Sequence, residues 1–423
     1  MGNLLVAPIT EKETHRGTTE DGLDYGLSSM QGWRVHMEDA HILEGSLHAE
    51  EVETEKESKE DGGTLKKMKI DNASAENVEP ASSSAAGSRA NESAEYKRIH
   101  LPRHSLFAVF DGHGGSFAAE YAGSNFVRVL SRQRAFVEYA HFVKDLAARD
   151  ALENMTTGKD EGEEKSVGMS PAERAEINRK GLDLLETALK DAFLDIDREI
   201  WREVRGLGNT DAVLPSKSNN YDGADDNDEN NDNDEEEWQK SDSGTTANVV
   251  LFTPNWIICA NAGDSRSVYS KQGNCTIPLS YDHKPDDEAE ERRVYEAGGF
   301  VRGGRVEGDL AVSRGLGDFR FKQDVLYGAM GDGYVSFSQY DDARSRKGGS
   351  GPTSVKSPED QKVSPMPDIV VQNRNGQHDE FVILACDGIF DVQTNHECIG
   401  LATEIFGQGE SDLGLICEEV SCF

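Results

Sequence analysis

Apolar residues in this chain follow two spacings, one typical of amphipathic helices and one typical of buried strands. Over 116–143 and again over 182–200, large apolar residues recur every three or four positions. Shorter segments with helical character cover 288–297, 397–406 and 412–420. Each of these segments predicts a helix that buries one face.

Continuous apolar runs predict buried strands at 106–110, 248–252, 256–260 and 380–386, and residues 22–44 are expected to form a short strand pair. The second and third runs are separated by a three-residue turn that contains proline, which predicts a hairpin. Helices and strands do not alternate regularly, and the strands cluster as hairpins. This order favours an α+β fold with antiparallel sheets.

Polar segments of low complexity interrupt this pattern. They are rich in Glu, Ser, Gly, Lys and Asp, and they cover about 45–103, 216–242 and 339–363, while 151–172 is also polar. Such composition cannot bury enough apolar surface to offset the entropy of ordering. We therefore expect one domain over 22–423 that is interrupted by loose insertions.

The negative charge of the chain is large and concentrated. The formal net charge is −35, and residues 222–237 contain ten Asp or Glu and no basic residue. This run predicts a solvated loop, because it repels itself and lacks the spacing of a calcium-binding loop. The acidic balance argues against a nucleic-acid partner, since phosphate binding requires Lys and Arg.

The cysteine pattern and the hydropathy of the chain predict where in the cell the protein lies. The six cysteines are scattered without a C-x-x-C pair, and no signal peptide is evident, so we expect reduced thiols in a cytoplasmic protein, with the nucleus as an alternative. No apolar stretch is long enough for a transmembrane helix. Gly2 is a weak candidate for myristoylation, because Val6 stands where the signal requires Ser or Thr.

Carboxylates at strand ends are the main candidates for chemistry. Two apolar strands each end in an Asp-Gly pair, at Asp111 and at Asp387, and a further acidic pair is Glu38-Asp39. An isolated Asp in this position is often only a turn cap. Several of them, without cysteine or paired-histidine spacing, indicate oxygen-only coordination of hard cations such as Mg²⁺ or Mn²⁺.

Taken together, these motifs resemble the metal-dependent type 2C protein serine/threonine phosphatases. The resemblance extends from about Gly22 almost to the end of the chain and implies a β-sandwich with helices packed on both outer faces. It rests on five blocks in the family's order, at residues 25–40, 107–115, 243–247 with 261–266, 309–318 and 383–391.

The resemblance implies hydrolysis of phosphoserine and phosphothreonine in proteins by a water that bridges two Mg²⁺ or Mn²⁺ ions, without a phosphoenzyme. Asp111 and the carbonyl of Gly112 are expected as metal ligands, and Asp387 would complete the shell of one ion. Glu38 and Asp39 would serve the other ion, although neighbours in a strand point to opposite faces. The chain has no C-x₅-R loop of the kind that a cysteine-dependent phosphatase requires.

Further roles follow from the same resemblance, each with a plainer alternative. Arg34 matches a position that binds phosphate, and its alternative is an ion pair with Glu38 or Asp39. His113 could protonate the departing oxygen, or it could make a structural hydrogen bond. Asp264 matches a position associated with a third, weaker ion in some members, or it serves a turn.

The end of the family pattern is the point of disagreement. An Asp-Asn pair and a final apolar strand are expected after Asp387, and neither is present, so one metal carboxylate and one strand are expected to be missing. A catalytically impaired, phosphoprotein-binding pseudophosphatase or scaffold is therefore the alternative function. Binding through the acidic run is a third. Phosphorylated proteins are the expected partners, a monomer is the simplest assembly, and Thr246 and Arg314 are expected to support the site.

Overall fold

Five antiparallel strands form the central sheet of the computed structural model, which describes residues 4–53, 95–156, 169–208, 211–214, 240, 242–273, 275–322 and 357–421. In spatial order they are β14 (Asp368–Asn373), β10 (Trp256–Ala262), β9 (Ala247–Phe252), β6 (Ser105–Phe110) and β3 (Ala40–Glu44). The predicted hairpin is confirmed, with Ile257 of β10 opposite Phe252 of β9. β9 and β10 are buried along their whole length, which explains why their sequences are apolar without alternation.

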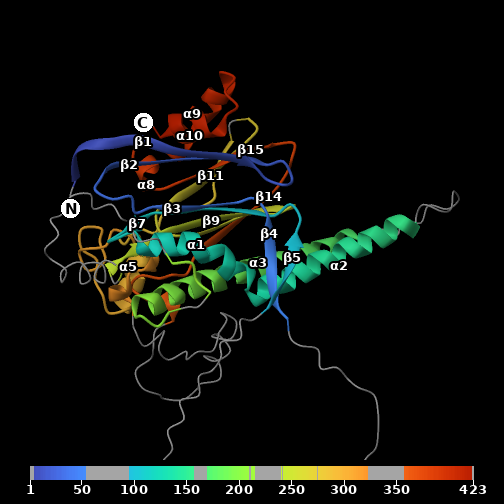
Figure 1. Cartoon of the computed structure of the whole chain (residues 1–423), viewed down its shortest axis with the longest axis horizontal. Helices are drawn as coiled ribbons and strands as arrows, with labels where there is room; N and C mark the ends of the chain where they lie inside the picture. Colours follow the sequence, from blue (N-terminus) through green and yellow to red (C-terminus); the bar gives the residue numbers. More distant parts are fainter. Residues whose placement is uncertain are drawn as a thin grey trace, which may run out of the picture.

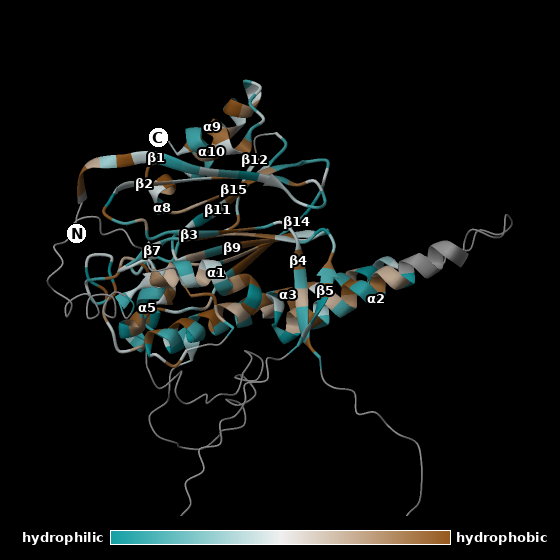
Figure 2. Cartoon of the chain, in the orientation of Figure 1, coloured by the Kyte–Doolittle hydropathy of each residue, from teal (hydrophilic) through white to brown (hydrophobic). Residues whose placement is uncertain are grey.

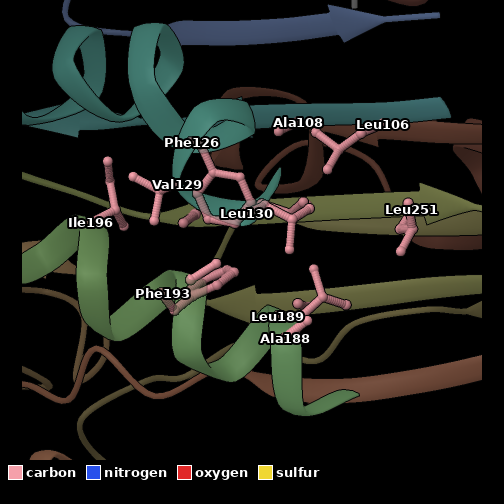
Figure 3. Close-up of a cluster of buried hydrophobic side chains, with 14 of the residues drawn as sticks. Leu106, Ala108, Phe126, Val129, Leu130, Ala188, Leu189, Phe193, Ile196 and Leu251 are labelled. Atoms are coloured by element: carbon pink, nitrogen blue, oxygen red, sulfur yellow. The ribbon is translucent and has the colours of Figure 1, made fainter. Parts of the chain in front are cut away.

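Two helices, α1 (Phe117–Ser131) and α3 (Pro171–Val204), cover one face of this sheet (Figure 1). A third helix, α2 (Arg134–Thr156), packs on α3 and extends away from the sheet. Figure 3 shows Phe126 of α1 and Phe193 of α3 facing each other, in the same buried cluster as Leu251 of β9. The residues of α3 change from hydrophilic to hydrophobic around the helix (Figure 2), as the predicted period requires. A capping box at Ser170, followed by Pro171 in the first turn, defines where α3 begins.

The single helix expected over 116–143 is two helices. The helical path breaks at Arg132 and Gln133, where the Gln133 side-chain amide donates to Asp195 of α3 at 2.9 Å. This break lets α1 and α2 each pack on α3. The polar segment expected at 151–172 is also shorter than predicted, because α2 continues to Thr156.

A second sheet packs on the other face of the first. It contains β12 (Cys275–Pro278), β11 (Arg266–Lys271) and β15 (Asp379–Ala385), and Tyr269 lies in one apolar cluster with Phe107 of the central sheet. Its outer side is covered by α8 (Asp387–Phe390), α9 (Asn395–Gly407) and α10 (Leu413–Val420). The α+β class with antiparallel sheets is therefore confirmed, and the described layers run helix, sheet, sheet, helix.

Smaller elements complete the described fold. They are β1 (Leu4–Thr18) paired with β2 (Asp24–Arg34), β4 (Leu47–Val52) paired with β5 (Tyr96–Leu101), the three short strands β7 (Gly112–His113), β8 (Gly244–Thr245) and β13 (Leu316–Gly317), the helix α5 (Glu288–Glu296), and the 3₁₀ turns η1 (Phe319–Phe321) and η2 (Pro358–Asp360).

The strands near the N-terminus pair differently from the prediction. The strands predicted within 22–44 exist, but they do not pair with each other: β2 pairs with β1, and β3 pairs with β6. The ordered fold thus includes residues before 22. A strand pattern identifies a strand but not its partner, since the partner is set by long-range hydrogen bonds.

Two of the predicted insertions include residues that are ordered in the structure. Within 45–103 the strands β4 and β5 form a ladder whose buried side chains include Leu47 and Leu101, both 1% exposed. Within 339–363 the last residues are ordered, and Val363 is fully buried. Alternating polar residues on the outer face hid these strands. Gly2, the acidic run 222–237 and most of the three insertions lie outside the described residues.

Two further observations concern the described residues. None of their helices combines the length and the apolar character needed to cross a bilayer. Their five cysteines are not joined by disulfides.

A buried charge network attaches α5 to β14. The Glu290 carboxylate, 5% exposed, accepts from Arg314 Nη2 at 2.8 Å, from Arg293 Nη1 at 2.6 Å and from the Ser313 hydroxyl. Arg314 also reaches Asp368 of β14 at 2.7 Å. Burial alone would raise the pKa of Glu290, but the hydrogen bonds and charges of the two arginines lower it to about 2.

Glu290→Gln is expected to lower the free energy of unfolding by roughly 3 kcal/mol at pH 7, because it leaves two buried arginines without their anion. The folded pKa of Glu290 is depressed below its ordinary value of 4.5, so its contribution is complete above that value and is lost as pH falls towards 2. Urea unfolding at pH 7 and pH 3 should show the wild-type advantage over E290Q shrink to less than half. Glu288→Gln, at an exposed position on the same helix, is the control, and an E290Q deficit that is equal at both pH values would contradict the prediction.

Candidate active site

Asp111 follows β6 and is fixed through its backbone. Its N–H donates to Thr246 Oγ1 at 3.2 Å, and its carbonyl accepts from the Thr246 N–H at 2.9 Å and from Thr245 Oγ1 at 3.0 Å. Thr246 is itself 2% exposed and bonds the Ser265 hydroxyl at 2.8 Å. Thr246 therefore supports the site as expected, by holding the strand end that carries Asp111.

Gly112 brings a second segment against Asp111. A Cβ at this position would lie 2.0 Å from the carbonyl oxygen of Glu38, so only glycine allows the two backbones to approach this closely. The Gly112 N–H donates to Asp39 Oδ1 at 3.4 Å, and the Gly115 N–H donates to Glu38 Oε1 at 2.9 Å.

The expectation that Glu38 and Asp39 point to opposite faces was wrong. Both residues lie in the loop between β2 and β3, not in a strand, so the alternation of strand side chains does not apply. Both carboxylates accept from backbone N–H groups of the same glycine-rich segment after Asp111. The sequence prediction therefore had the wrong local backbone for these two residues.

Asp387 reaches the same place from the second sheet. It is the first residue of α8, directly after β15, and its carboxyl group is close enough to that of Asp111 for a hydrogen bond when one of them is protonated. The Cys386 thiol lies next to this group and acts on the pKa of Asp39. Burial and the surrounding carboxylates raise the pKa of the Cys386 thiol, which disfavours its thiolate form.

The carboxylates of Asp111, Asp39 and Asp387 all have raised pKa values. Burial raises the pKa of Asp111, and the charges of Asp39, Asp387 and Asp264 raise it further. Burial is also the largest cause that raises the pKa of Asp39 and of Asp387. The pKa is raised at all three residues because each carboxylate adds negative charge to a region with little water.

This donor set fits hard divalent cations. All of its ligating atoms are oxygens, and a cation would supply the positive charge that the raised pKa values show to be lacking. Within the described ranges, no three or more His, Cys, Asp or Glu side chains already form a closed cluster that could hold a metal ion. A site for Mg²⁺ does not need one, because this ion keeps several waters beside one or two carboxylates.

His113 faces a carboxylate that the sequence analysis did not assign. Its Nε2 lies 2.9 Å from both carboxylate oxygens of Asp318, which is 2% exposed. Burial lowers the pKa of His113, but the charge and hydrogen bonds of Asp318 outweigh it, and the net pKa is raised. Asp318 adopts a left-handed backbone with φ of 54°, and a Cβ at Gly244 would collide with its carboxylate. Such strain next to a buried acid is a signal that only the structure gives.

The remaining expected residues are placed as follows. Arg34 Nη1 lies 3.7 Å from Glu38 Oε2, which is the ion pair given as its alternative, and its side chain is 65% exposed. Asp264, 4% exposed, is paired with the Lys284 ammonium. Arg314 belongs to the Glu290 network instead of contacting the Asp111 carboxylate.

The sequence was compared with known protein families. The sequence model of the family described as "Protein phosphatase 2C" matches residues 81–172 and 178–422, which is more than half of the chain. The chain belongs to the protein phosphatase 2C family. The expected family is thereby confirmed. The matched residues include the segments that carry Asp111 and Asp387 but not residues 25–40.

Individual protein phosphatase 2C relatives agree. Protein phosphatase 2C homolog 3 of Schizosaccharomyces pombe is 31% identical over 94% of this chain and 58% of its own length. A probable protein phosphatase 2C of Caenorhabditis elegans is 29% identical over 99% of this chain and 73% of its own. The chain spans about three fifths of the length of the first fungal relatives, 58% to 62%.

A solved structure supports the fold. The serine-threonine phosphatase 2C of Toxoplasma gondii superposes with a TM-score of 0.50 and 16% identity, over 99% of this chain and 92% of that one. At this identity the likeness concerns the fold alone.

Gly112→Ala is expected to lower the free energy of unfolding by about 1–3 kcal/mol, because the added methyl group must displace the Glu38 backbone. The matched control is Gly400→Ala in α9, where an added Cβ meets nothing within 4 Å and should stabilise the helix by about 0.5–1 kcal/mol. Urea unfolding of both variants measures the difference. Equal stability of G112A and G400A would show that the close approach is not needed.

Proposed function

We propose that this chain is a metal-dependent phosphatase that removes phosphate from phosphoserine and phosphothreonine in proteins. The observation that carries the proposal is the meeting of half-buried carboxylates from separate segments, Glu38-Asp39, Asp111 and Asp387, at one glycine-rich turn. Membership of the protein phosphatase 2C family supports the same reaction.

The carboxylates of Asp111, Asp387, Asp39 and Glu38, with the carbonyl of Gly112, would hold two Mg²⁺ or Mn²⁺ ions. When bound, such ions lower the pKa of a coordinated water and offset phosphate charge. The chain itself keeps the ligands in place: backbone N–H groups orient Glu38 and Asp39, and Thr246 fixes the strand end at Asp111.

Hydrolysis then needs a nucleophile and a proton donor. A water oxygen forms the new bond to phosphorus as the bond to the serine or threonine oxygen breaks, so no phosphoenzyme arises. Arg34 is exposed enough to turn its guanidinium from Glu38 to the phosphate oxygens. The contact of Asp318 with Nε2 raises the pKa of His113, and Nδ1 would donate a proton to the departing oxygen.

Phosphorylated proteins are the proposed partners, with the chain acting as a monomer. The second candidate is a phosphoprotein-binding protein with impaired catalysis, which the Arg34–Glu38 ion pair favours. In that arrangement the guanidinium already has a carboxylate partner. The assays below separate the two candidates, because a binding protein would retain the phosphopeptide without releasing phosphate.

Asp111→Asn is expected to lower phosphate release from a phosphothreonine peptide by at least about 100-fold, since several kcal/mol of transition-state stabilisation depend on the ions. Release by the wild type should require Mn²⁺ or Mg²⁺ and should stop with EDTA. A colorimetric assay of inorganic phosphate measures both effects.

Asp183→Asn, an exposed carboxylate on α3, is the control for the loss of one negative charge and should keep full activity. Full activity of D111N, or release that is insensitive to EDTA, would refute the metal-dependent mechanism. Binding of the peptide without any release, by a folded wild-type protein, would favour the second candidate.

His113→Gln is expected to lower kcat on the phosphothreonine peptide by about 100-fold or more, because the departing alkoxide then lacks its proton donor. With p-nitrophenyl phosphate the loss should stay below about 10-fold, since nitrophenolate leaves without a proton. Steady-state kinetics on both substrates check the difference. His141→Gln, in a surface pair with Glu51, serves as the control. Equal losses of H113Q on both substrates would assign His113 a structural role.

A further inference from the structure

A fully buried ion pair joins α3 to the residue that follows η1. The Lys322 ammonium donates to Asp197 Oδ1 at 2.8 Å, and the two side chains are 1% and 0% exposed. Both charges lose their hydration, so a pair of this kind adds little stability compared with apolar side chains of similar volume. We therefore asked which part of the chain the pair holds in place.

The ion pair holds the turn that carries Asp318. Asp197 Oδ1 also accepts from the Gly317 N–H at 2.7 Å, and Lys322 Nζ also donates to the Gly315 carbonyl at 2.9 Å. The pair thus bonds to the chain on both sides of Asp318. These bonds are buried, so water does not compete for them and each is stronger than it would be on the surface.

The same turn also packs on the start of β8. The Asp318 N–H donates to the Ser243 carbonyl at 3.2 Å. Gly317 has φ of 75°, and a Cβ there would lie 2.5 Å from the Ser243 carbonyl oxygen. The turn is therefore held between α3 and the strand that pairs with β7, which contains His113.

Asp318 needs this support. Its left-handed backbone, with φ of 54°, is a conformation that residues other than glycine keep only where their surroundings impose it. Both oxygens of its carboxylate lie 2.9 Å from His113 Nε2. Relaxation of the backbone at Asp318 would turn the carboxylate away from His113.

A surface ion pair in the same turn is a weaker anchor. Arg320 pairs with Asp242 and Asp309, but the Arg320 side chain is 46% exposed. Exposed pairs contribute little, because water and salt screen their charges. The buried Asp197–Lys322 pair is therefore the stronger electrostatic link between this turn and the rest of the fold.

We propose that Asp197 and Lys322 are positioning residues, which together hold the Asp318 carboxylate against His113 Nε2. The proposal rests on the proposed role of His113 as proton donor. Asp197 and Lys322 act through the turn that carries Asp318 and not through contact with the substrate. Helix α3 then has a part in the chemistry as well as in the core.

A double-mutant cycle followed by urea unfolding tests the positioning without an activity assay. The full chain is used, with Mg²⁺ present in every sample. D197L/K322M replaces the pair with apolar side chains of similar volume, which should preserve the fold. His113→Ala is expected to lower the folding equilibrium constant of the wild type by at least about 10-fold, because buried Asp318 loses a charge-assisted partner. In D197L/K322M the same change should cost less than about 3-fold, because the contact is already loosened.

The control for this cycle is R128M/E199L, which removes another ion pair that α3 makes. Arg128 and Glu199 have side chains that are 16% and 17% exposed, and they do not bond to the Asp318 turn in the contacts described above. H113A should therefore cost the same in R128M/E199L as in the wild type, since distant sites act additively.

Kinetics links the positioning to the reaction. In D197L/K322M we expect kcat on the phosphothreonine peptide to fall by about 10-fold or more, and kcat on p-nitrophenyl phosphate by less than about 3-fold, because only the first leaving group needs a proton. KM for the peptide should stay within about 2-fold of wild type, since substrate binding is not changed. R128M/E199L should keep both kcat values.

Two results would overturn the proposal. An equal cost of H113A in the wild type and in D197L/K322M would show that the pair only stabilises the fold. No cost of H113A in the wild type would show that the contact with Asp318 is not one that the fold maintains. D197N, which keeps the shape of the side chain and loses its charge, takes the same measurements if D197L/K322M does not fold.

Failure of the proposed function is distinguishable from failure of this inference. A chain that releases no phosphate still gives the unfolding cycle, and coupling in that cycle would support the positioning of Asp318. Coupling together with equal kinetic losses on both substrates would likewise support the positioning, and it would count against His113 as the proton donor.

Discussion

The close approach of several half-buried carboxylates is the constraint on which this structure depends. Asp39, Asp111 and Asp387 come from three segments far apart in the sequence, and burial with mutual repulsion raises the pKa of each. The protein offsets this cost with weak partners, since backbone N–H groups face Glu38 and Asp39 and the Lys284 ammonium faces Asp264. Folding alone leaves the group short of positive charge, which is the condition that divalent cations satisfy.

The scaffold concentrates this charge because its core is rigid. Helices α1 and α3 pack over the central sheet, and the second sheet closes its other face (Figures 1 and 3). Both sheets end at the same place, so β6 delivers Asp111 and β15 delivers Asp387. A close-packed core resists rearrangement, and it can therefore hold like charges together that would separate on a flexible surface.

Glycine and backbone strain mark the points where this arrangement is tightest. Gly112 admits the Glu38 backbone, and Gly244 admits the carboxylate of Asp318. Asp318 is held in a left-handed conformation and aims its carboxylate at His113. His113 is paired with Asp318 and Asp264 with Lys284, so each of these side chains has a defined polar partner.

The sequence by itself determined the kinds of element and the chemistry. Apolar runs located β6 and β15, helical spacing located α3, and Asp-Gly at two strand ends identified the oxygen-rich group, because these signals are local in the chain. Only the tertiary structure decided which strands pair and which side chains contact each other. The partner of β2, the buried faces of β4 and β5, the loop conformation of Glu38-Asp39 and the contact of His113 with Asp318 all depend on residues tens to hundreds of positions apart. Such contacts follow from packing and long-range hydrogen bonds, which leave no periodic trace in the sequence.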